Sequence, residues 1–255
     1  MKIIQIEKNI LNFEFEEKDA LFPFNITALI ENEKIILIDL AYKRFADHVK
    51  KYFEDKGYFE FEIYLTHHHE DHFEGMKSFP DAKIIASKNF KTDFQEHLQT
   101  DEILKNFVPE KSIEDLQNYK SENFEIQFIK IPGHNNCEFA FLINQKHLRL
   151  GDLLFFDAEE KLSLPYIDGH SYVDDYLESL EKLKALNIET LICGHGKPVS
   201  DKTEIIEHIE DLKFYLNRIK TDNDAELETC LKKDKSNFSG LMFHSNNLAR
   251  VKAAK

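Results

Sequence analysis

Four histidines and two carboxylates crowd into the seven residues THHHEDH (66–72), at the end of the strand-like segment FEIYLT (61–66). Imidazoles this close to one another repel when they are protonated, and they pack poorly in an apolar core. A bound cation is the simplest reason for such crowding. The fold must then bring further ligands to this segment, because it holds too few donors to complete two four-coordinate sites.

The spacing within the segment divides its donors between two ions. Residues two apart in an extended chain point the same way, so His67 and His69 can bind one ion together. Asp71 and His72 follow where the chain turns into a helix, and there they can reach a second ion. His68 is expected to point to the opposite face and to bind neither ion.

Three further candidate ligands each follow an apolar strand-like segment and have a glycine beside them. His134 ends PGH after 124–131, Asp152 ends GD after 146–150, and His195 lies in CGHG after 190–193. The glycines allow tight turns, and strand ends that converge on one edge of a sheet are a common way to build a site. An adventitious histidine tract would explain 67–69 but not these three motifs.

The number of candidate ligands and their charges suggest how they are divided between the two metal ions. We expect one metal on His67, His69 and His134, a second on Asp71, His72 and His195, and Asp152 as a bridge between them.

The rest of the chain predicts a layered α/β body. Short strand-like segments alternate with helical ones up to about residue 200, the region from 88 to about 120 is expected to be mostly helical, and the pattern is wholly helical from about 203. The stripe of Phe45, Val49, Tyr52 and Phe53 predicts one of the helices. We therefore expect a domain over 1–202 and a helical C-terminal extension, 203–255, packed on it.

Composition narrows the partners and the compartment. The 255 residues are 42% hydrophobic, which allows a sizeable core, and no stretch approaches the ~20 apolar residues of a membrane span. Three cysteines at unrelated spacings form no disulfide framework, and the N-terminus shows no signal-peptide pattern, so we expect a cytoplasmic protein. The net charge of -14 disfavours nucleic acid and anionic lipid. A small-molecule substrate is expected, and a homodimer stays open.

THHHEDH, PGH, GD and GHG, in that order, resemble the metallo-β-lactamase superfamily, whose signature is HxHxDH followed by a His, an Asp and a His. The resemblance spans residues 1 to about 200 and fills all seven ligand positions. It implies a four-layer αββα sandwich with the metals in a cleft at one edge. LID (37–39) resembles the family's LIDTG strand end, which would place Asp39 behind the ligands, with Leu40 and Ala41 in place of Thr-Gly.

The resemblance also implies hydrolysis. Two divalent ions, zinc first and iron or manganese as alternatives, would activate a shared water as hydroxide for attack on an ester-type carbonyl, with Asp71 as a catalytic residue. The glyoxalase II and lactonase groups, which cleave thioesters and lactones, are the most similar branches. Their PGHTPG or PGHSPG turn is PGHNNCE (132–138) in this chain.

Three alternatives stay open. A β-lactamase-like hydrolase is disfavoured because the zinc β-lactamases have a Cys where this chain has Asp152. A persulfide dioxygenase would use a single iron on His67, His134 and Asp152. A non-catalytic metal-binding module is the third.

Substrate contacts are harder to predict. Tyr166, His170 and Tyr172 lie between Asp152 and His195 and are candidates. Arg250 is another, because the C-terminal part of glyoxalase II supplies cations for the glutathione carboxylates. LFPFN (21–25) is either an apolar flap over the metals or ordinary core packing.

Overall fold

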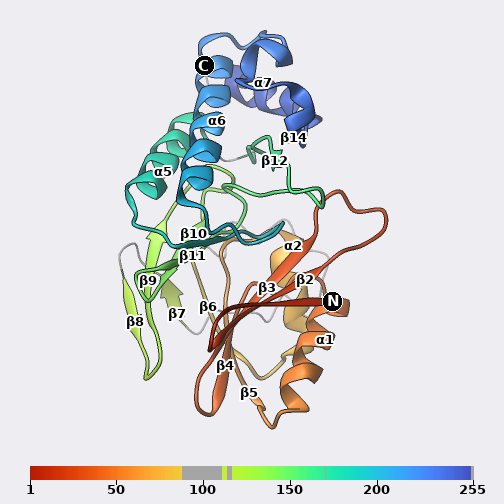
Figure 1. Ribbon diagram of the computed structural model, residues 1–255, viewed down its shortest axis with the longest axis vertical. Coiled ribbons are helices and arrows are strands. Elements are labelled where there is room, and N and C mark those ends of the chain that lie inside the picture. The colour runs from red at the N-terminus through yellow and green to blue at the C-terminus, as the bar shows by residue number, and fades with distance from the viewer. Residues whose placement is uncertain (88–110, 114–116, 170, 254–255) are drawn as a thin grey trace.

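Two facing β-sheets with helices outside them form the body of the protein (Figure 1). The computed structural model describes residues 1–87, 111–113, 117–169 and 171–253. The strands are β1 (Lys2–Glu7), β2 (Ile10–Phe15), β3 (Phe24–Ile30), β4 (Lys34–Ile38), β5 (Glu60–Tyr64), β6 (Lys83–Ser87), β7 (Lys111–Ile113), β8 (Asn118–Lys120), β9 (Glu125–Lys130), β10 (Phe139–Ile143), β11 (His147–Arg149), β12 (Leu162–Ser163), β13 (Thr190–Ile192) and β14 (Phe238–Ser239). The α-helices are α1 (Lys43–Glu54), α2 (Glu70–Phe73), α5 (Val173–Ala185), α6 (Lys202–Thr221) and α7 (Phe243–Ala253), and the 3-10 helices are η1 (Glu74–Ser78), η3 (Leu227–Cys230) and η4 (Lys235–Asn237).

The directions of the strands determine which of the loops that carry candidate ligands lie side by side. The first sheet has the order β1 to β7, antiparallel from β1 to β4 and parallel from β4 to β7. The second sheet has the order β13-β11-β10-β9-β8, in which β11 and β13 run parallel and the other neighbours antiparallel. Parallel neighbours end at the same edge of a sheet. The loops after β4 and β5, and those after β11 and β13, are therefore neighbours.

Three apolar clusters define the layers. One fills the space between the sheets, where Ile36 and Tyr64 of the first sheet meet Phe128 and Phe141 of the second. Another joins the outer face of the first sheet to α1. The third joins the outer face of the second sheet to α5 and α6. The order α1, sheet, sheet, α5 and α6 confirms the predicted four-layer αββα sandwich.

The helix predicted from the Phe45 stripe is α1, which buries Phe45, Val49 and Phe53. The expected helical region from 88 to about 120 lies mostly outside the described residues, which leave out 88–110 and 114–116; within it, the described residues 111–113 and 118–120 form the strands β7 and β8. Another expectation was wrong. The region after 203 is not wholly helical, because β14 pairs in parallel with β12. A two-residue strand is too short to show a period of two in the sequence.

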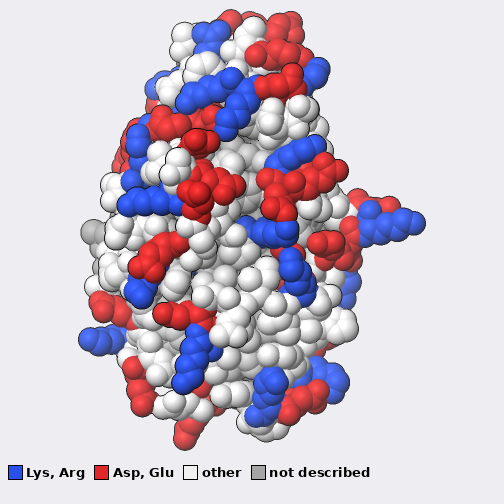
Figure 2. All heavy atoms as spheres, viewed as in Figure 1, with Lys and Arg blue, Asp and Glu red and all other residues white. Residues whose placement is uncertain are grey.

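The C-terminal region is joined to the body by this pairing and by side chains. Leu162 pairs with Phe238, and the buried Asn247 of α7 donates from Nδ2 to the carbonyl of Pro165 at 2.6 Å. None of the helices in the described ranges is long and apolar enough to cross a membrane. Figure 2 shows Lys and Arg lying among Asp and Glu over much of one face, so the charge excess is not gathered into one patch there.

Candidate metal centre

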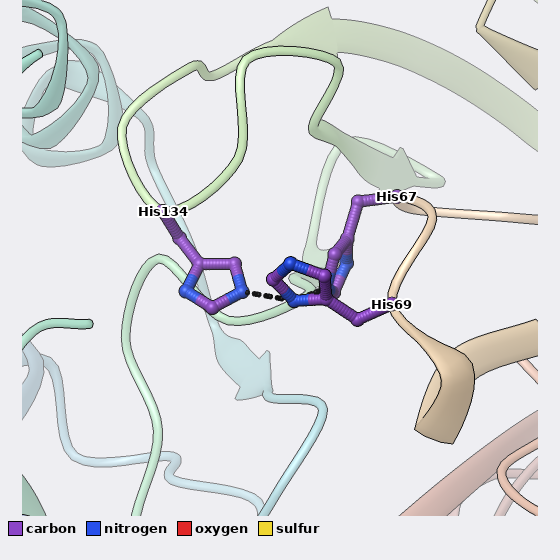
Figure 3. Close-up of side chains that lie close together, drawn as sticks. All are labelled: His67, His69 and His134. Carbon is purple, nitrogen blue, oxygen red and sulfur yellow. Dashed lines mark hydrogen bonds between the residues drawn. The ribbon is translucent and has the colours of Figure 1, made fainter. Parts of the chain in front are cut away.

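Three histidines from two loops point their rings at one place (Figure 3). His67 and His69 follow β5, and His134 follows β9. Nδ1 of His69 lies 3.2 Å from Nε2 of His67 and 2.9 Å from Nε2 of His134. We call these residues the histidine group.

Four more side chains form a second cluster beside the first. Asp71 and His72 lie in α2, Asp152 follows β11, and His195 follows β13. Nε2 of His195 lies 3.2 Å from Asp152 Oδ2 and 3.4 Å from Asp71 Oδ2, and Nε2 of His72 lies 3.3 Å from Asp152 Oδ1. We call these four the carboxylate group. Asp152 also faces the histidine group, since its Oδ2 is 3.8 Å from His134 Nε2.

Backbone carbonyls fix the tautomer of two of these histidines. A carbonyl only accepts, so Nδ1–H of His134 donates to Tyr166 O at 2.9 Å and Nδ1–H of His195 donates to Pro23 O at 2.7 Å. In each ring the other nitrogen, Nε2, faces the centre; in His134 it carries a lone pair, and in His195 it faces the carboxylates of Asp152 and Asp71. This is how proteins orient neutral imidazoles for a metal.

Side-chain oxygens hold the other three imidazoles. His69 reaches Asp168 Oδ2 through Nε2 at 3.4 Å, and His67 Nδ1 lies 3.0 Å from Thr66 Oγ1, whose hydroxyl donates to Asp39. Nδ1 of His72 donates to Asp39 Oδ2 at 3.0 Å. All five rings therefore have one nitrogen engaged outside the centre and the other directed into it.

Asp39, at the end of β4, lies behind both groups. Its carboxylate accepts from Thr66 N at 2.8 Å, from His72, and from Nη2 of Arg149 at 3.0 Å. Arg149 is fully buried and also donates from Nε to Thr27 Oγ1 at 3.0 Å. Ala41 has φ 50°, so the backbone of this turn is left-handed although the residue is not a glycine.

The two groups differ in electrostatics. Burial and the nearby imidazoles lower the pKa of His67 well below its usual range, and burial and His69 lower the pKa of His134 to about 3. In the carboxylate group burial acts in the same direction, but Asp152 outweighs it and raises the pKa of His195 to about 10. Asp152 and Asp39 likewise raise the pKa of His72 above its usual range. Burial opposes the shift of Asp71, yet His72 and His195 lower its pKa to about 2.

Two glycines beside the candidate ligands leave room for neighbouring side chains to lie against the backbone. A Cβ on Gly151 would meet Glu138 Oε1 at 2.7 Å and His67 Nδ1 at 2.8 Å. A Cβ on Gly194 would meet Asp152 and would lie 2.7 Å from His72 Cε1. Neither residue has a positive φ. Both lie in bends of the chain, and space for the neighbouring side chains is a further reason for glycine there; Gly196, beside His195, has φ 87°, the left-handed backbone that favours glycine.

The donor set fits metal ions. In each group one ligand atom from every member lies within 4.8 Å of the others. Nε2 of His72 and Oδ1 of Asp152 are buried 3.3 Å apart, and among the described residues neither forms a hydrogen bond of good geometry; a cation between them would satisfy both atoms. Imidazole and carboxylate are the donors that zinc and similar divalent ions use.

A cavity of about 300 Å³ opens over both groups. His69 and Asp71 reach it with 24% and 26% of their side chains exposed. Tyr166 also lines it, as do Leu21, Phe22 and Phe24 of the LFPFN segment, which favours the flap over ordinary core packing.

Tyr172 and Arg250 line a separate cavity of about 340 Å³, so their contact with substrate stays a prediction. His170 lies outside the described residues.

Sequence reasoning missed four supporting residues. Arg149 was detectable as a charge inside the apolar strand-like segment KHLRL. Glu138, which is buried and accepts from the backbone N–H groups of Asp152 at 2.8 Å and Leu153 at 3.0 Å, belongs to the unusual PGHNNCE turn. Asp168 and Thr66 carry no sequence signal of their own, because only the folded loops bring them to the histidines.

Comparison with known proteins agrees with the geometry. The profile of the metallo-beta-lactamase superfamily matches residues 62–195, over half of the chain, and the protein belongs to that superfamily. The resemblance predicted from the four motifs is confirmed.

Individual relatives are more distant. A hydroxyacylglutathione hydrolase from Prochlorococcus marinus is 30% identical over 179 residues, which cover 67% of this chain and 64% of that protein. A beta-lactamase-like protein 2 homolog from Caenorhabditis elegans is 29% identical over 159 residues, 57% of this chain and 47% of that protein. The chain thus matches less than two thirds of the length of these relatives.

A solved structure shows the same fold. A metallo-beta-lactamase family protein from Thermus thermophilus superposes with a TM-score of 0.67 at 18% sequence identity, covering 96% of this chain and 93% of that one. At this identity the likeness concerns the fold alone.

Proposed function

We propose that the protein is a metal-dependent hydrolase that holds two divalent ions, zinc first, and cleaves an ester-type bond, a thioester or lactone, in a small molecule. The observation that carries the proposal is the convergence of seven donor atoms in two adjacent groups, five of whose residues, His69, Asp71, His134, Asp152 and His195, line one cavity. Curated relatives named hydroxyacylglutathione hydrolase favour a thioester. Two ions bound there would lower the pKa of a shared water and polarise the substrate carbonyl.

The chain's own residues divide the remaining work. His67, His69 and His134 would hold one ion, Asp71, His72 and His195 would hold the other, and Asp152 faces both groups of ligands. Asp71 is the carboxylate with the more exposed side chain, at 26% against 7% for Asp152. Its low pKa keeps it ionised at neutral pH, so a carboxylate oxygen not engaged by the ion would accept a hydrogen bond from a water in the cavity and orient it.

Elemental analysis and a substrate panel test the proposal together. The purified protein should hold two divalent ions per chain and should hydrolyse thioesters or lactones in preference to β-lactams. His69→Ala should lose hydrolysis and metal while staying folded by circular dichroism. His48→Ala, which removes an exposed histidine of α1, is the matched control and should keep both.

Two results would overturn the proposal. Hydrolysis and both ions retained in His69→Ala would contradict the ligand sets on which the proposal rests. One iron per chain, with oxygen uptake on glutathione persulfide, would replace the hydrolase with the mononuclear dioxygenase.

A further inference from the structure

An aromatic wall encloses the cavity above the two groups. Phe22 lies 5.1 Å from Phe155 and 6.2 Å from Phe243, and Phe243 lies 5.2 Å from Tyr166, measured between ring centroids. Phe24 adds a fifth ring beside His195, at 5.5 Å. These rings come from the β2–β3 loop and β3, the loops before and after β12, and the start of α7.

The wall is continuous with the candidate ligands at both ends. The Tyr166 ring is 5.7 Å from that of His134, and the Phe22 and Phe155 rings are 6.0 and 5.7 Å from that of His195. Phe22, Tyr166 and Phe243 are only partly buried. They therefore keep apolar surface that a substrate can cover while its carbonyl lies over the centre.

The wall offers no counter-charge for an acidic substrate. The described residues that line the cavity include no Lys and no Arg. Arg44 lies near, 4.5 Å from the ring centroid of Tyr42, but Glu17 accepts from it twice, at 2.7 and 2.8 Å. Arg250 lines the other cavity. A substrate carboxylate placed against these rings would lose much of its hydration and would meet the hydroxyls of Tyr42 and Tyr166 but no cationic side chain among the described lining residues.

We propose, on the basis of the proposed function, that the acyl part of the substrate is an uncharged alkyl or aryl group covered by Phe22 and Phe243. The cavity of about 300 Å³ is at the small end for ligand sites, so it suits an acyl group of modest size. The wall would then select against acyl groups that end in a carboxylate.

A series of S-methyl thioesters tests this, because the small leaving group stays constant while the acyl chain varies. With metal-loaded protein, kcat/KM should rise about fourfold for each methylene from the acetic to the butyric and hexanoic thioester. The monothioester of adipic acid, with six carbons and a terminal carboxylate, should be at least about a hundredfold poorer than the hexanoic one. Calorimetry with the methyl ketones of the same chains gives a binding readout that needs no turnover.

Two variants locate the effect. Phe243→Ala should reduce the gain per methylene to about twofold, and Phe22→Ala does the same from another loop if the first variant fails to fold. Met242→Ala removes the exposed neighbour of Phe243 and should keep the full dependence.

The outcomes separate this inference from the proposed function. Hydrolysis that is independent of chain length, or that favours the adipic thioester, would overturn the inference and leave the hydrolase in place. A chain-length dependence unchanged in both folded Phe variants would also overturn it. No hydrolysis of these thioesters or of the lactones of the substrate panel, but ketone binding that strengthens with chain length, would overturn the hydrolase and uphold the apolar wall.

Discussion

The histidine group and the carboxylate group share one floor, yet they respond to protons in opposite ways. In the first, burial and mutual repulsion lower the pKa of His67 and bring that of His134 to about 3. In the second, Asp152 overcomes burial and raises the pKa of His195 to about 10. A proton can therefore take the place of a cation in the carboxylate group, whereas His67 and His134 stay neutral.

This difference follows from where the carboxylates lie. Asp71 and Asp152 belong to the second group, and Asp39 accepts from His72. The histidine group has Asp152 at its edge, 3.8 Å from His134, and Asp168 on the outer side of His69. Two adjacent sites built from similar ligands are thus expected to load with metal under different conditions. Four measurements test that contrast, taken from the largest effect downwards.

Asp152→Ala removes the side chain that faces both groups. We expect at least about a thousandfold loss of kcat/KM, the rate equivalent of several kcal/mol of lost charge stabilisation. Metal content should also fall, because His72 and His195 would lose the carboxylate between them. Elemental analysis and thioester hydrolysis measure the two effects. Asp174→Ala, on the exposed side of α5, is the control, and two retained ions in Asp152→Ala would contradict the bridging position.

Acidification should weaken the carboxylate group far more than the histidine group. At pH 7 a cation must displace protons from both His72 and His195, so its binding should release about two protons and weaken by up to about a hundredfold for each pH unit lost. Binding of a cation at the histidine group should release no protons from His67 or His134. Zinc calorimetry in buffers of different ionisation enthalpy measures this, with His195→Ala and His69→Ala isolating one group each. If zinc binding released equal numbers of protons from the two variants, the predicted difference between the two groups would be contradicted.

Asp168→Ala should act on the histidine group alone. The carboxylate is held by Asn135 Nδ2 at 2.9 Å and by Gly169 N, and it accepts from His69, the ligand whose Nδ1 faces the centre. Without it His69 loses its orientation, and zinc affinity at that group should fall by up to about a hundredfold. Competition with a chelating dye gives the affinity. Asp168→Asn should recover part of it, and weakening at both groups alike would indicate a general structural effect.

Thr66→Val should have the smallest effect and should reach both groups. Its hydroxyl joins His67 to Asp39, and Asp39 also accepts from His72. We expect about a tenfold loss of zinc affinity, the low end for such partners, because Thr66 N still donates to Asp39. Thr66→Ser keeps the hydroxyl and should bind like the unaltered protein. An effect confined to the histidine group would show that Asp39 does not couple the two.

Much of this architecture could be predicted from residue patterns. The strand-like segments before His67, His134, Asp152 and His195 were visible as apolar runs, and parallel strands that end at one edge do bring their loops together. The short strands β7, β8, β12 and β14 could not be predicted, because their two or three residues carry no apolar run, whereas the equally short β11 and β13 lie within the apolar segments 146–150 and 190–193.

The sequence by itself determined the superfamily, the layered fold and the identity of seven candidate ligands. Closely spaced, buried histidines and aspartates destabilise a fold unless a bound cation offsets their desolvation and repulsion. Only the tertiary structure decided what surrounds them. The carbonyls of Pro23 and Tyr166, the buried Arg149 and the carboxylate of Asp168 reach the centre from loops and strands far apart in the chain. The wall of Phe22, Phe155 and Phe243 forms in the same way. Such contacts depend on the path of the folded chain, and no local spacing of residues encodes them.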